Sequence, residues 1–103
     1  MNEQDGILDE VKGMVELNDH LIGEIKQLII QRLKLVEMTP EMIDTDASLF
    51  GEGLGLDSID ALELVLGLEK EFGVIIPDAD VGKKVFQSVR TIAQYVVDEQ
   101  RSA

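Results

Sequence analysis

The sequence predicts an all-α fold, a small four-helix bundle made of three main helices, one short helix and a long first loop. Apolar residues recur at helical spacing in three separate segments, with charged and polar residues between them. No two segments look like partnered strands, which a sheet would require. The chain has 103 residues, 45% of them hydrophobic, which is room for one domain with a real core.

The first main helix is expected from about Asp19 to Val36. Asn18 or Asp19 can cap its start, and Thr39-Pro40 should force an extended backbone soon after its end. Its apolar positions lie three and four residues apart, at Leu21, Ile22, Ile25, Leu28, Ile29 and Leu33.

A long connection follows, from Glu37 to Asp57, and it contains Pro40 and three glycines. It is too apolar for a free linker, so we expect a loop that folds back onto the core. The residues expected to make this contact are Met42, Ile43, Leu49, Phe50, Leu54 and Leu56.

The second main helix is expected from about Ser58 to Phe72, where Gly73 is placed to stop it. Residues 74–76 are apolar but have no partner strand, so they are expected to form a buried connector. The rest of the bundle is a short helix at about Asp78 to Lys84 and a last helix that Ser88 caps, through Val97.

The folded domain is expected over residues 20–100, with residues 101–103 as a C-terminal tail. Residues 1–19 form an acidic N-terminal extension with apolar positions at helical spacing, but Gly6 and Gly13 weaken a helix there. An extra helix and a frayed leader both stay open. This start lacks the basic residues and the apolar run of a secretion signal, so the cytoplasm is the expected location.

The charge balance excludes several classes of partner. Nine Lys and Arg residues stand against 21 Asp and Glu residues, for a net charge of −12 and a pI near 4.2. Nucleic acid and anionic membranes both need a basic surface, so neither is expected as a partner. No apolar stretch approaches the ~20 residues of a membrane span. The acidic field favours partner proteins with basic patches, and its self-repulsion favours a monomer.

Few residues are available for catalysis or metal binding. The chain has no cysteine, which excludes disulfides, thiolate metal sites and a cysteine nucleophile. Its one histidine, His20, stands alone and is expected to face solvent. Neither Asp44 nor Asp78 opens a loop with the ligand spacing of an EF-hand, and the glycines of the long loop complete no nucleotide-binding pattern. We therefore expect no metal site and no catalytic residue.

A serine stands where the long loop meets the second helix, in Gly55-Leu56-Asp57-Ser58-Ile59-Asp60. By itself Asp57-Ser58 indicates no more than a helix cap. The wider run resembles the prosthetic-group region of acyl carrier proteins, since it continues with Glu63-Leu64-Val65 and Leu68-Glu69-Lys70-Glu71-Phe72. The resemblance extends over about residues 20–100, through Ala47-Ser48-Leu49-Phe50, Ile76-Pro77-Asp78 and residues 89–97.

The resemblance implies that Ser58 carries a 4'-phosphopantetheine arm, whose phosphodiester would lie at a helix N-terminus that favours negative charge. Asp57 belongs to the same attachment motif. Acyl groups would be held as thioesters on the thiol of that arm, so the chain would need no cysteine of its own. A phosphopantetheinyl transferase would supply the catalysis, so the chain is expected to be an acyl carrier and not an enzyme.

The resemblance also assigns partner docking to four acidic positions, Asp57, Asp60, Glu63 and Glu69. They would meet Arg and Lys patches on acyl-transferring, condensing or acyl-activating enzymes, with plain solvated charge as the alternative. An acyl chain held between the helices would need apolar walls, and Gly67 would leave room for such a chain or for close helix packing. The expected lining residues are Phe50, Leu62, Leu66, Ile75 and Ile92, for each of which ordinary core packing is the alternative.

Two positions depart from the family pattern. Ile59 stands where Leu is usual, and Lys70 stands where an acid is common, which breaks the acidic stripe and can change which partner docks. Together with the acidic extension, these departures leave the pathway open among fatty-acid, lipid and polyketide-type biosynthesis. Two other functions stay open, an unmodified acidic interaction module and a carrier of aminoacyl or peptidyl cargo.

Overall fold

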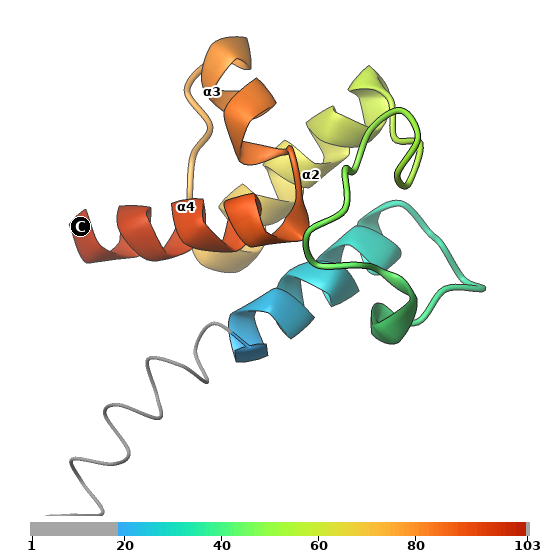
Figure 1. The fold of residues 1–103 in the computed structure, drawn as a ribbon. Coiled ribbons are helices and arrows are strands. Elements are labelled where there is room, and N and C mark those ends of the chain that lie inside the picture. Colours follow the sequence, from blue (N-terminus) through green and yellow to red (C-terminus); the bar gives the residue numbers. More distant parts are fainter. Residues whose placement is uncertain (1–18, 103) are drawn as a thin grey trace, which may run out of the picture.

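The computed structural model describes residues 19–102, so the N-terminal extension expected before residue 19 lies outside the described part. The first helix covers residues 19–32 of that part, and it is followed by the single 3-10 turn η1 (Pro40–Met42), α2 (Ser58–Phe72), α3 (Ala79–Val85) and α4 (Val89–Ser102), as Figure 1 shows. Among these residues there is no strand, and the one β-type pairing is an isolated bridge between Phe50 and Leu56. The predicted all-α bundle of three main helices and one short helix is confirmed.

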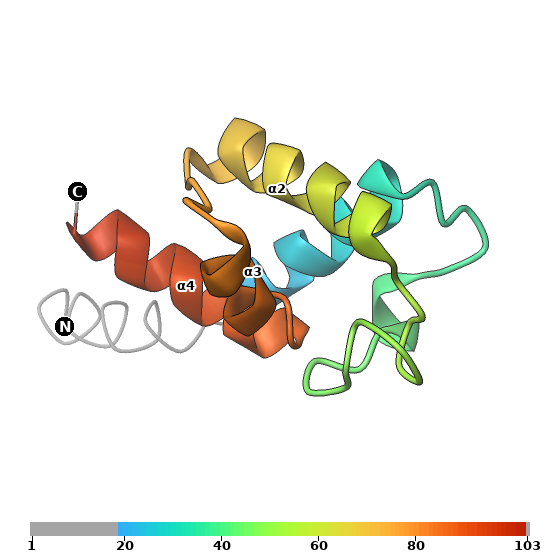
Figure 2. The same cartoon turned by 90° about the horizontal axis from the view of Figure 1, so that it is seen from above.

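The long first loop and the start of α2 lie at one end of the bundle, and the end of α4 lies at the other, in both views of the fold (Figures 1 and 2). The core is built mainly from positions three and four residues apart on the three long helices, and residues of the first loop and of the connector after α2 complete it. Its largest fully buried side chains are Ile25, Ile29, Leu49, Leu64, Leu68, Val89, Ile92 and Val96. Burial of each such side chain stabilises the fold by about 1.5–3 kcal/mol, so the helical apolar pattern accounts for most of the core.

The first helix ends earlier than the predicted Val36, because Lys34 adopts a left-handed backbone with φ 56°. The amide of Leu35 then donates to the carbonyl of Ile30 at 2.9 Å, and the amide of Lys34 donates to the carbonyl of Gln31 at 3.4 Å. This pair of bonds is the Schellman termination, with Lys34 at the position that glycine usually occupies. Val36 therefore lies outside the helix, with 89% of its surface exposed.

The first loop folds back onto the core, as predicted. Ile43, Leu49 and Leu56 are buried, while Met42 is 63% exposed and does not make the expected contact. The loop is tied to the start of α4, because the amide of Leu49 donates to the carbonyl of Gln87 at 3.1 Å. It is therefore a fixed part of the domain and not a tether.

An ion pair adds to this attachment of the loop. Arg90, in the first turn of α4, donates through its guanidinium to both carboxylate oxygens of Asp46, and its amide donates to the carbonyl of Thr45 at 3.0 Å. The hydrogen bond from Arg90 lowers the pKa of Asp46 below its ordinary value. Both side chains are more than half exposed, so this ion pair contributes little to the free energy of unfolding. Its main effect is to orient the loop against the start of α4.

α2 and α3 begin and end within one residue of their predicted bounds, and α4 begins where predicted. Gly73 ends α2 in a left-handed conformation, with its amide donating to the carbonyl of Glu69 at 3.0 Å. Asp78 caps α3 through the amide of Val81 at 2.9 Å, and the hydroxyl of Ser88 accepts from the amide of Thr91 at 3.2 Å in the first turn of α4. α4 continues past its predicted end at Val97 and includes residues 101–102, which were predicted to form the C-terminal tail.

The connector between α2 and α3 is only partly buried. Val74 is buried as predicted, but Ile75 is 61% exposed, because the hydroxyl of Tyr95 donates to the carbonyl of Ile75 at 2.8 Å and fixes the backbone with that side chain outward. Burial, with smaller contributions from Glu99 and Asp78, raises the pKa of Tyr95. The expectation of a fully buried connector is wrong at Ile75.

Candidate functional site

Ser58 is the first residue of α2, and its side chain is exposed. The preceding residue, Asp57, is the N-cap: its Oδ1 accepts from the amides of Ile59 and Asp60, each at 3.0 Å. Asp60 completes a capping box, because its Oδ2 accepts from the amide of Asp57 at 3.0 Å. In the described part of the chain the Ser58 hydroxyl makes no hydrogen bond, so it is available for modification.

The loop that precedes this serine is held by close backbone contacts. The amide of Leu54 donates to the carbonyl of Ser48 at 3.2 Å, and the amide of Leu56 donates to the carbonyl of Leu49 at 3.0 Å. A side chain at Gly53 would require this loop to shift, since its Cβ would lie 1.4 Å from the carbonyl oxygen of Ser48. Gly53 thus allows the compact turn that leads to Asp57 at the start of α2.

An apolar groove of about 640 Å³ begins at Ser58 and runs between α2 and α3. Ser58, Leu62 and Val65 follow one another on one face of α2 at spacings of three and four residues. The other apolar walls come from the first loop, from α2 itself, from the connector, from α3 and from the residue after α3, at Phe50, Leu56, Ala61, Ile76, Ala79 and Phe86. The rim is polar, with Asp57, Asp78 and Lys83. A chain attached at Ser58 would therefore have an apolar surface directly beside its attachment point.

The structure brings two of the five expected lining residues to this groove, Phe50 and Leu62. Leu66 lies on α2 but outside the groove, and Ile75 points to solvent at 61% exposure. Ile92 is a core residue at 1% exposure. The apolar groove residues that were not predicted are Leu56, Ala61, Val65, Ile76, Ala79 and Phe86. The helical spacing of Val65 from Ser58 was a usable signal, whereas Ile76 and Phe86 depend on how α3 lies against α2.

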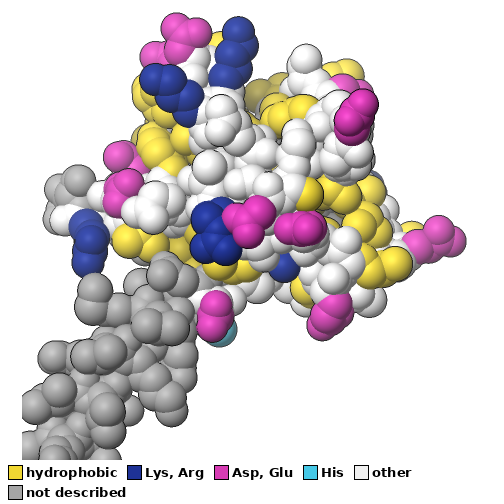
Figure 3. Space-filling view, in the orientation of Figure 1, with side chains coloured by type: hydrophobic (Ala, Val, Ile, Leu, Met, Phe, Trp, Pro, Cys, Tyr) yellow, Lys and Arg dark blue, Asp and Glu magenta, His cyan; other side chains and the backbone are white. Residues whose placement is uncertain are grey.

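The four expected docking acids are placed differently from one another. Asp57 and Asp60 are occupied by capping, and Glu63 lies 3.8 Å from Arg32 between Oε1 and Nη1. Glu69 is exposed. On the face of the molecule seen in Figure 3, acidic side chains are scattered among Lys and Arg and form no single patch. The four acids therefore have different neighbours.

The exposed face of α2 is apolar along its centre. Ile59, Leu62 and Leu66 are 74%, 60% and 44% exposed, and they lie three and four residues apart. Lys70 is exposed four residues after Leu66. The surface of α2 next to Ser58 is therefore apolar, with charges at its edges.

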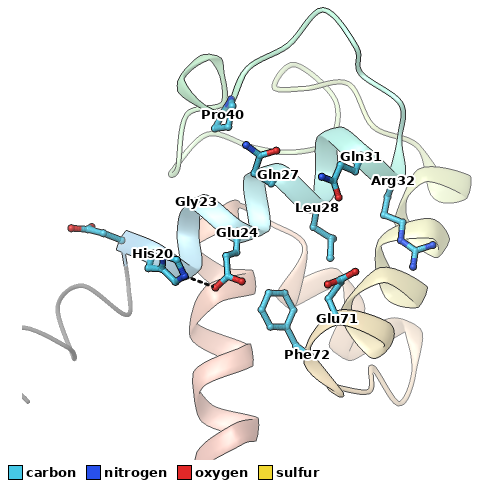
Figure 4. Close-up of a pocket in the computed structure, with 11 residues that line it drawn as sticks. His20, Gly23, Glu24, Gln27, Leu28, Gln31, Arg32, Pro40, Glu71 and Phe72 are labelled. Carbon is cyan, nitrogen blue, oxygen red and sulfur yellow. Dashed lines mark ion pairs between the residues drawn. The ribbon is translucent and has the colours of Figure 1, made fainter.

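A second hollow, of about 510 Å³, lies between the first helix and the end of α2 and does not include Ser58 (Figure 4). Its walls are mostly polar, with His20, Glu24, Arg32 and Glu71 among them. The imidazole Nε2 of His20 lies 3.3 Å from Glu24 Oε1, and the His20 side chain is 74% exposed, as expected for a surface histidine.

The described residues contain no group of three or more His, Cys, Asp and Glu side chains arranged to hold a metal ion. Within residues 19–102 we also find no helix long and apolar enough to cross a membrane. The features that remain are an exposed serine at the N-terminus of a helix and an apolar groove that starts beside it. An anion attached to this serine would lie at the positive end of the α2 dipole, so the site fits a phosphate-linked prosthetic group. The exposed serine and the groove beside it are the features expected of a helical domain that carries a covalently attached group.

Comparisons with known proteins agree with this class. The phosphopantetheine attachment site family matches residues 23–96. The acyl carrier protein of Treponema denticola is 35% identical over 83 residues, which is 81% of this chain and 99% of the relative. Those of Campylobacter hominis and Thermosynechococcus vestitus are 32% and 39% identical over 71% and 67% of this chain, and over 85% and 82% of their own lengths. The chain belongs to the acyl carrier protein family, so its role is that of an acyl carrier and its cofactor is covalent 4'-phosphopantetheine.

Proposed function

We propose that Ser58 is the residue that carries the 4'-phosphopantetheine arm. Its exposure, its free hydroxyl and its place at the N-terminus of α2 support this assignment. In loading, Ser58 Oγ would form a bond to the phosphorus of the pantetheine phosphate of coenzyme A; the pyrophosphate bond breaks, adenosine bisphosphate leaves, and the transferase takes the hydroxyl proton. Bound there, the arm supplies a thiol that holds acyl groups as thioesters. Asp57 would act by fixing the helix start.

The groove beside Ser58 would shelter the acyl chain. Its walls carry mainly apolar atoms, and Phe50 and Leu62 from the predicted set line it. Transfer of a hydrocarbon chain from water to such a surface is favourable by about 0.8 kcal/mol per CH₂ that becomes fully buried. Leu66, Ile75 and Ile92 have no part in this proposal, because they lie outside the groove.

The partners proposed for this carrier are a phosphopantetheinyl transferase and the acyl-transferring, condensing or acyl-activating enzymes of a biosynthetic pathway. They would approach the exposed face of α2, whose apolar centre supplies contact area and whose acids Glu63 and Glu69 supply charge for basic patches. Asp57 and Asp60 add to the negative field but are already occupied by capping. The monomeric state, the cytoplasmic location, the choice of pathway and the domain limits at residues 20 and 100 stay predictions.

The decisive experiment is the intact mass of the protein before and after incubation with coenzyme A, magnesium and a broad-specificity phosphopantetheinyl transferase. The parent chain is expected to gain one phosphopantetheine group, and Ser58→Ala is expected to gain none. Ser48→Ala is the matched control, because Ser48 is an exposed serine of the preceding loop. A parent that stays unmodified, with the transferase active on another carrier and no group already present, would favour the unmodified interaction module.

Cargo is tested on the loaded protein. An acyl-activating enzyme and an amino-acid-activating enzyme are each offered the same holo protein, and the thioester formed is read by mass. We expect acyl thioesters to form. Exclusive formation of aminoacyl thioesters would instead support the second alternative, a carrier of aminoacyl or peptidyl cargo.

A further inference from the structure

The side chain of Arg32 crosses from the first helix onto α2 at Gly67. A Cβ atom at Gly67 would lie 3.1 Å from both Cγ and Nε of Arg32 and 3.2 Å from Cδ2 of Leu28. Gly67 is buried, and it is absent from the groove that begins at Ser58. Gly67 was expected to leave room either for an acyl chain or for close helix packing, and the contacts support close helix packing.

The guanidinium of Arg32 reaches one turn back along α2 from Gly67. Its Nη1 lies 3.8 Å from Oε1 of Glu63, and the two side chains are 27% and 45% exposed. Figure 4 shows Arg32 leaving the end of the first helix and extending alongside α2. Because the Arg32 stem is packed over Gly67, the guanidinium lies close to Glu63.

This ion pair changes the charge on one edge of the proposed docking face. Glu63 lies four residues after Ile59 and three before Leu66, at the side of the exposed apolar stripe that faces the first helix. Lys70 is exposed on the same side, one residue before Glu71. Glu63, which was predicted to receive a cation from a partner, is thus already next to Arg32, and Lys70 lies on the same side. Glu69, on the other edge, is exposed.

We propose that Arg32 is a specificity-determining residue, which occupies Glu63 and weakens the docking of partners that present Lys or Arg to that edge of α2. This inference rests on the proposed function, in which enzymes dock at α2 to reach Ser58. A partner cation at Glu63 must displace or tolerate the Arg32 guanidinium, and a like charge at short range is unfavourable. Gly67 makes the device possible, since a larger residue would push Arg32 away from α2.

The test measures kcat/KM for loading of Ser58 by a basic phosphopantetheinyl transferase with coenzyme A, at low and at high salt. Arg32→Gln keeps an aliphatic stem over Gly67 but removes the charge, and Arg32→Lys keeps the charge. We expect Arg32→Gln to raise kcat/KM about two- to fivefold at low salt, as the loss of one exposed ion pair allows, and high salt to remove the gain. Arg32→Lys should stay near the parent value.

Glu63→Gln identifies the residue through which Arg32 acts. In the Arg32→Gln background it should cancel the gain, because the carboxylate that Arg32 had occupied is then absent. Arg90→Gln is the matched control, since it makes the same chemical change in an ion pair between α4 and the first loop. Circular dichroism of each variant checks that the helices are retained.

The outcomes separate this inference from the proposed function. If the parent is loaded and Arg32→Gln leaves kcat/KM unchanged, or if Arg90→Gln raises it equally, Arg32 sets no specificity and the proposed function stands. If Glu63→Gln fails to cancel the gain, Arg32 does not act through Glu63 and the inference is overturned. If the parent is not loaded at all, the proposed function fails and this inference fails with it.

Discussion

Asp57 and Asp60 cap each other across the first turn of α2. Asp57 Oδ1 accepts from the amide of Asp60 at 3.0 Å, and Asp60 Oδ2 accepts from the amide of Asp57 at 3.0 Å. Ser58 lies between the two acids, so its backbone is held by this pair while its own hydroxyl stays exposed. The acids nearest the serine therefore have a structural role that does not depend on any partner.

Removal of the cap should destabilise the domain. Asp57→Ala leaves the amides of Ile59 and Asp60 without their acceptor, and we expect the free energy of unfolding to fall by about 1 kcal/mol in urea denaturation. Asp57→Ser should recover most of the loss, because a serine hydroxyl also accepts at an N-cap. Asp78→Ala, which removes a single accepted bond from the short helix α3, serves as the comparison. Parent-like stability of Asp57→Ala would contradict this role.

Gly53 cannot be replaced without moving the loop before Ser58. The added Cβ of Gly53→Ala would lie 1.4 Å from the carbonyl oxygen of Ser48, so we expect a loss of about 2–3 kcal/mol in thermal or urea unfolding. Gly51→Ala is the control, since its Cβ meets nothing within 4 Å and only its φ of 60° is unfavourable, at about 1 kcal/mol. Equal losses for the two variants would show that the close contact with Ser48 is not decisive.

Lys34→Gly should stabilise the protein. Lys34 holds a φ of 56° at the end of the first helix, where a Cβ is unfavourable and glycine is the usual residue. We expect the free energy of unfolding to rise by about 0.5–1 kcal/mol. This is less than the full cost of a left-handed lysine, because glycine also has more conformational entropy in the unfolded chain. Lys34→Val should be destabilising, since a β-branched residue tolerates this conformation poorly. A rise in Tm for glycine and a fall for valine is the expected pair of results.

Tyr95 should link stability to alkaline pH. Burial raises the pKa of its phenol above the ordinary value of 10.0, so the neutral, hydrogen-bonding form is favoured in the folded state. The contribution of Tyr95 to stability is fully present below the ordinary pKa, and it is lost as the pH rises through the raised pKa of the folded state. Tyr95→Phe removes the 2.8 Å bond to the Ile75 carbonyl and should cost about 1 kcal/mol at neutral pH.

The measurement for Tyr95 is urea unfolding of the parent and of Tyr95→Phe at neutral pH and at pH about 11, where a normal tyrosine is ionised. The stability difference between the two proteins should shrink at the higher pH. A difference that is the same at both values would show that the Tyr95 phenol does not contribute in its neutral form.

The groove can be filled from α2 without touching the attachment serine. Ala61→Phe places a large side chain inside the groove, and we expect faster hydrolysis of an octanoyl thioester carried on Ser58, because the acyl chain loses its shelter. Leu66→Phe is the matched control on the same helix, at a residue that is 44% exposed and outside the groove. Hydrolysis is followed by the intact mass of the loaded protein over time. Unchanged hydrolysis in Ala61→Phe would rule out this groove as the acyl site.

The predictions from sequence succeeded where the responsible interactions are local. The bounds of α2, the stop at Gly73 and the cap at Ser88 depend on residues within four positions of one another, and all three are confirmed. The end of the first helix was missed because Lys34, an ordinary helix former, adopts the left-handed conformation usually marked by glycine. Its local signal pointed to a longer helix, and the fold of the following loop overrides it.

Contacts between segments were not predictable in the same way. Leu62 and Leu66 have the same spacing and chemistry on α2, yet only Leu62 lines the groove, because α3 and the connector cover one side of the helix and not the other. Ile75 and Ile92 were both expected to line the acyl site, yet the first is exposed and the second lies in the core. Helical periodicity defines a face, but the neighbour of that face depends on how the helices cross.

The sequence by itself determined the four helices, the exposed serine at the start of α2 and, through its resemblance to a family, the acyl carrier role, because hydrogen bonds, caps and apolar periodicity act over a few residues. Only the tertiary structure decided which apolar side chains form the groove beside Ser58, and that Arg32 packs over Gly67 to reach Glu63. Those features arise where segments distant in the chain exclude water between them, and no local pattern specifies which segments will meet.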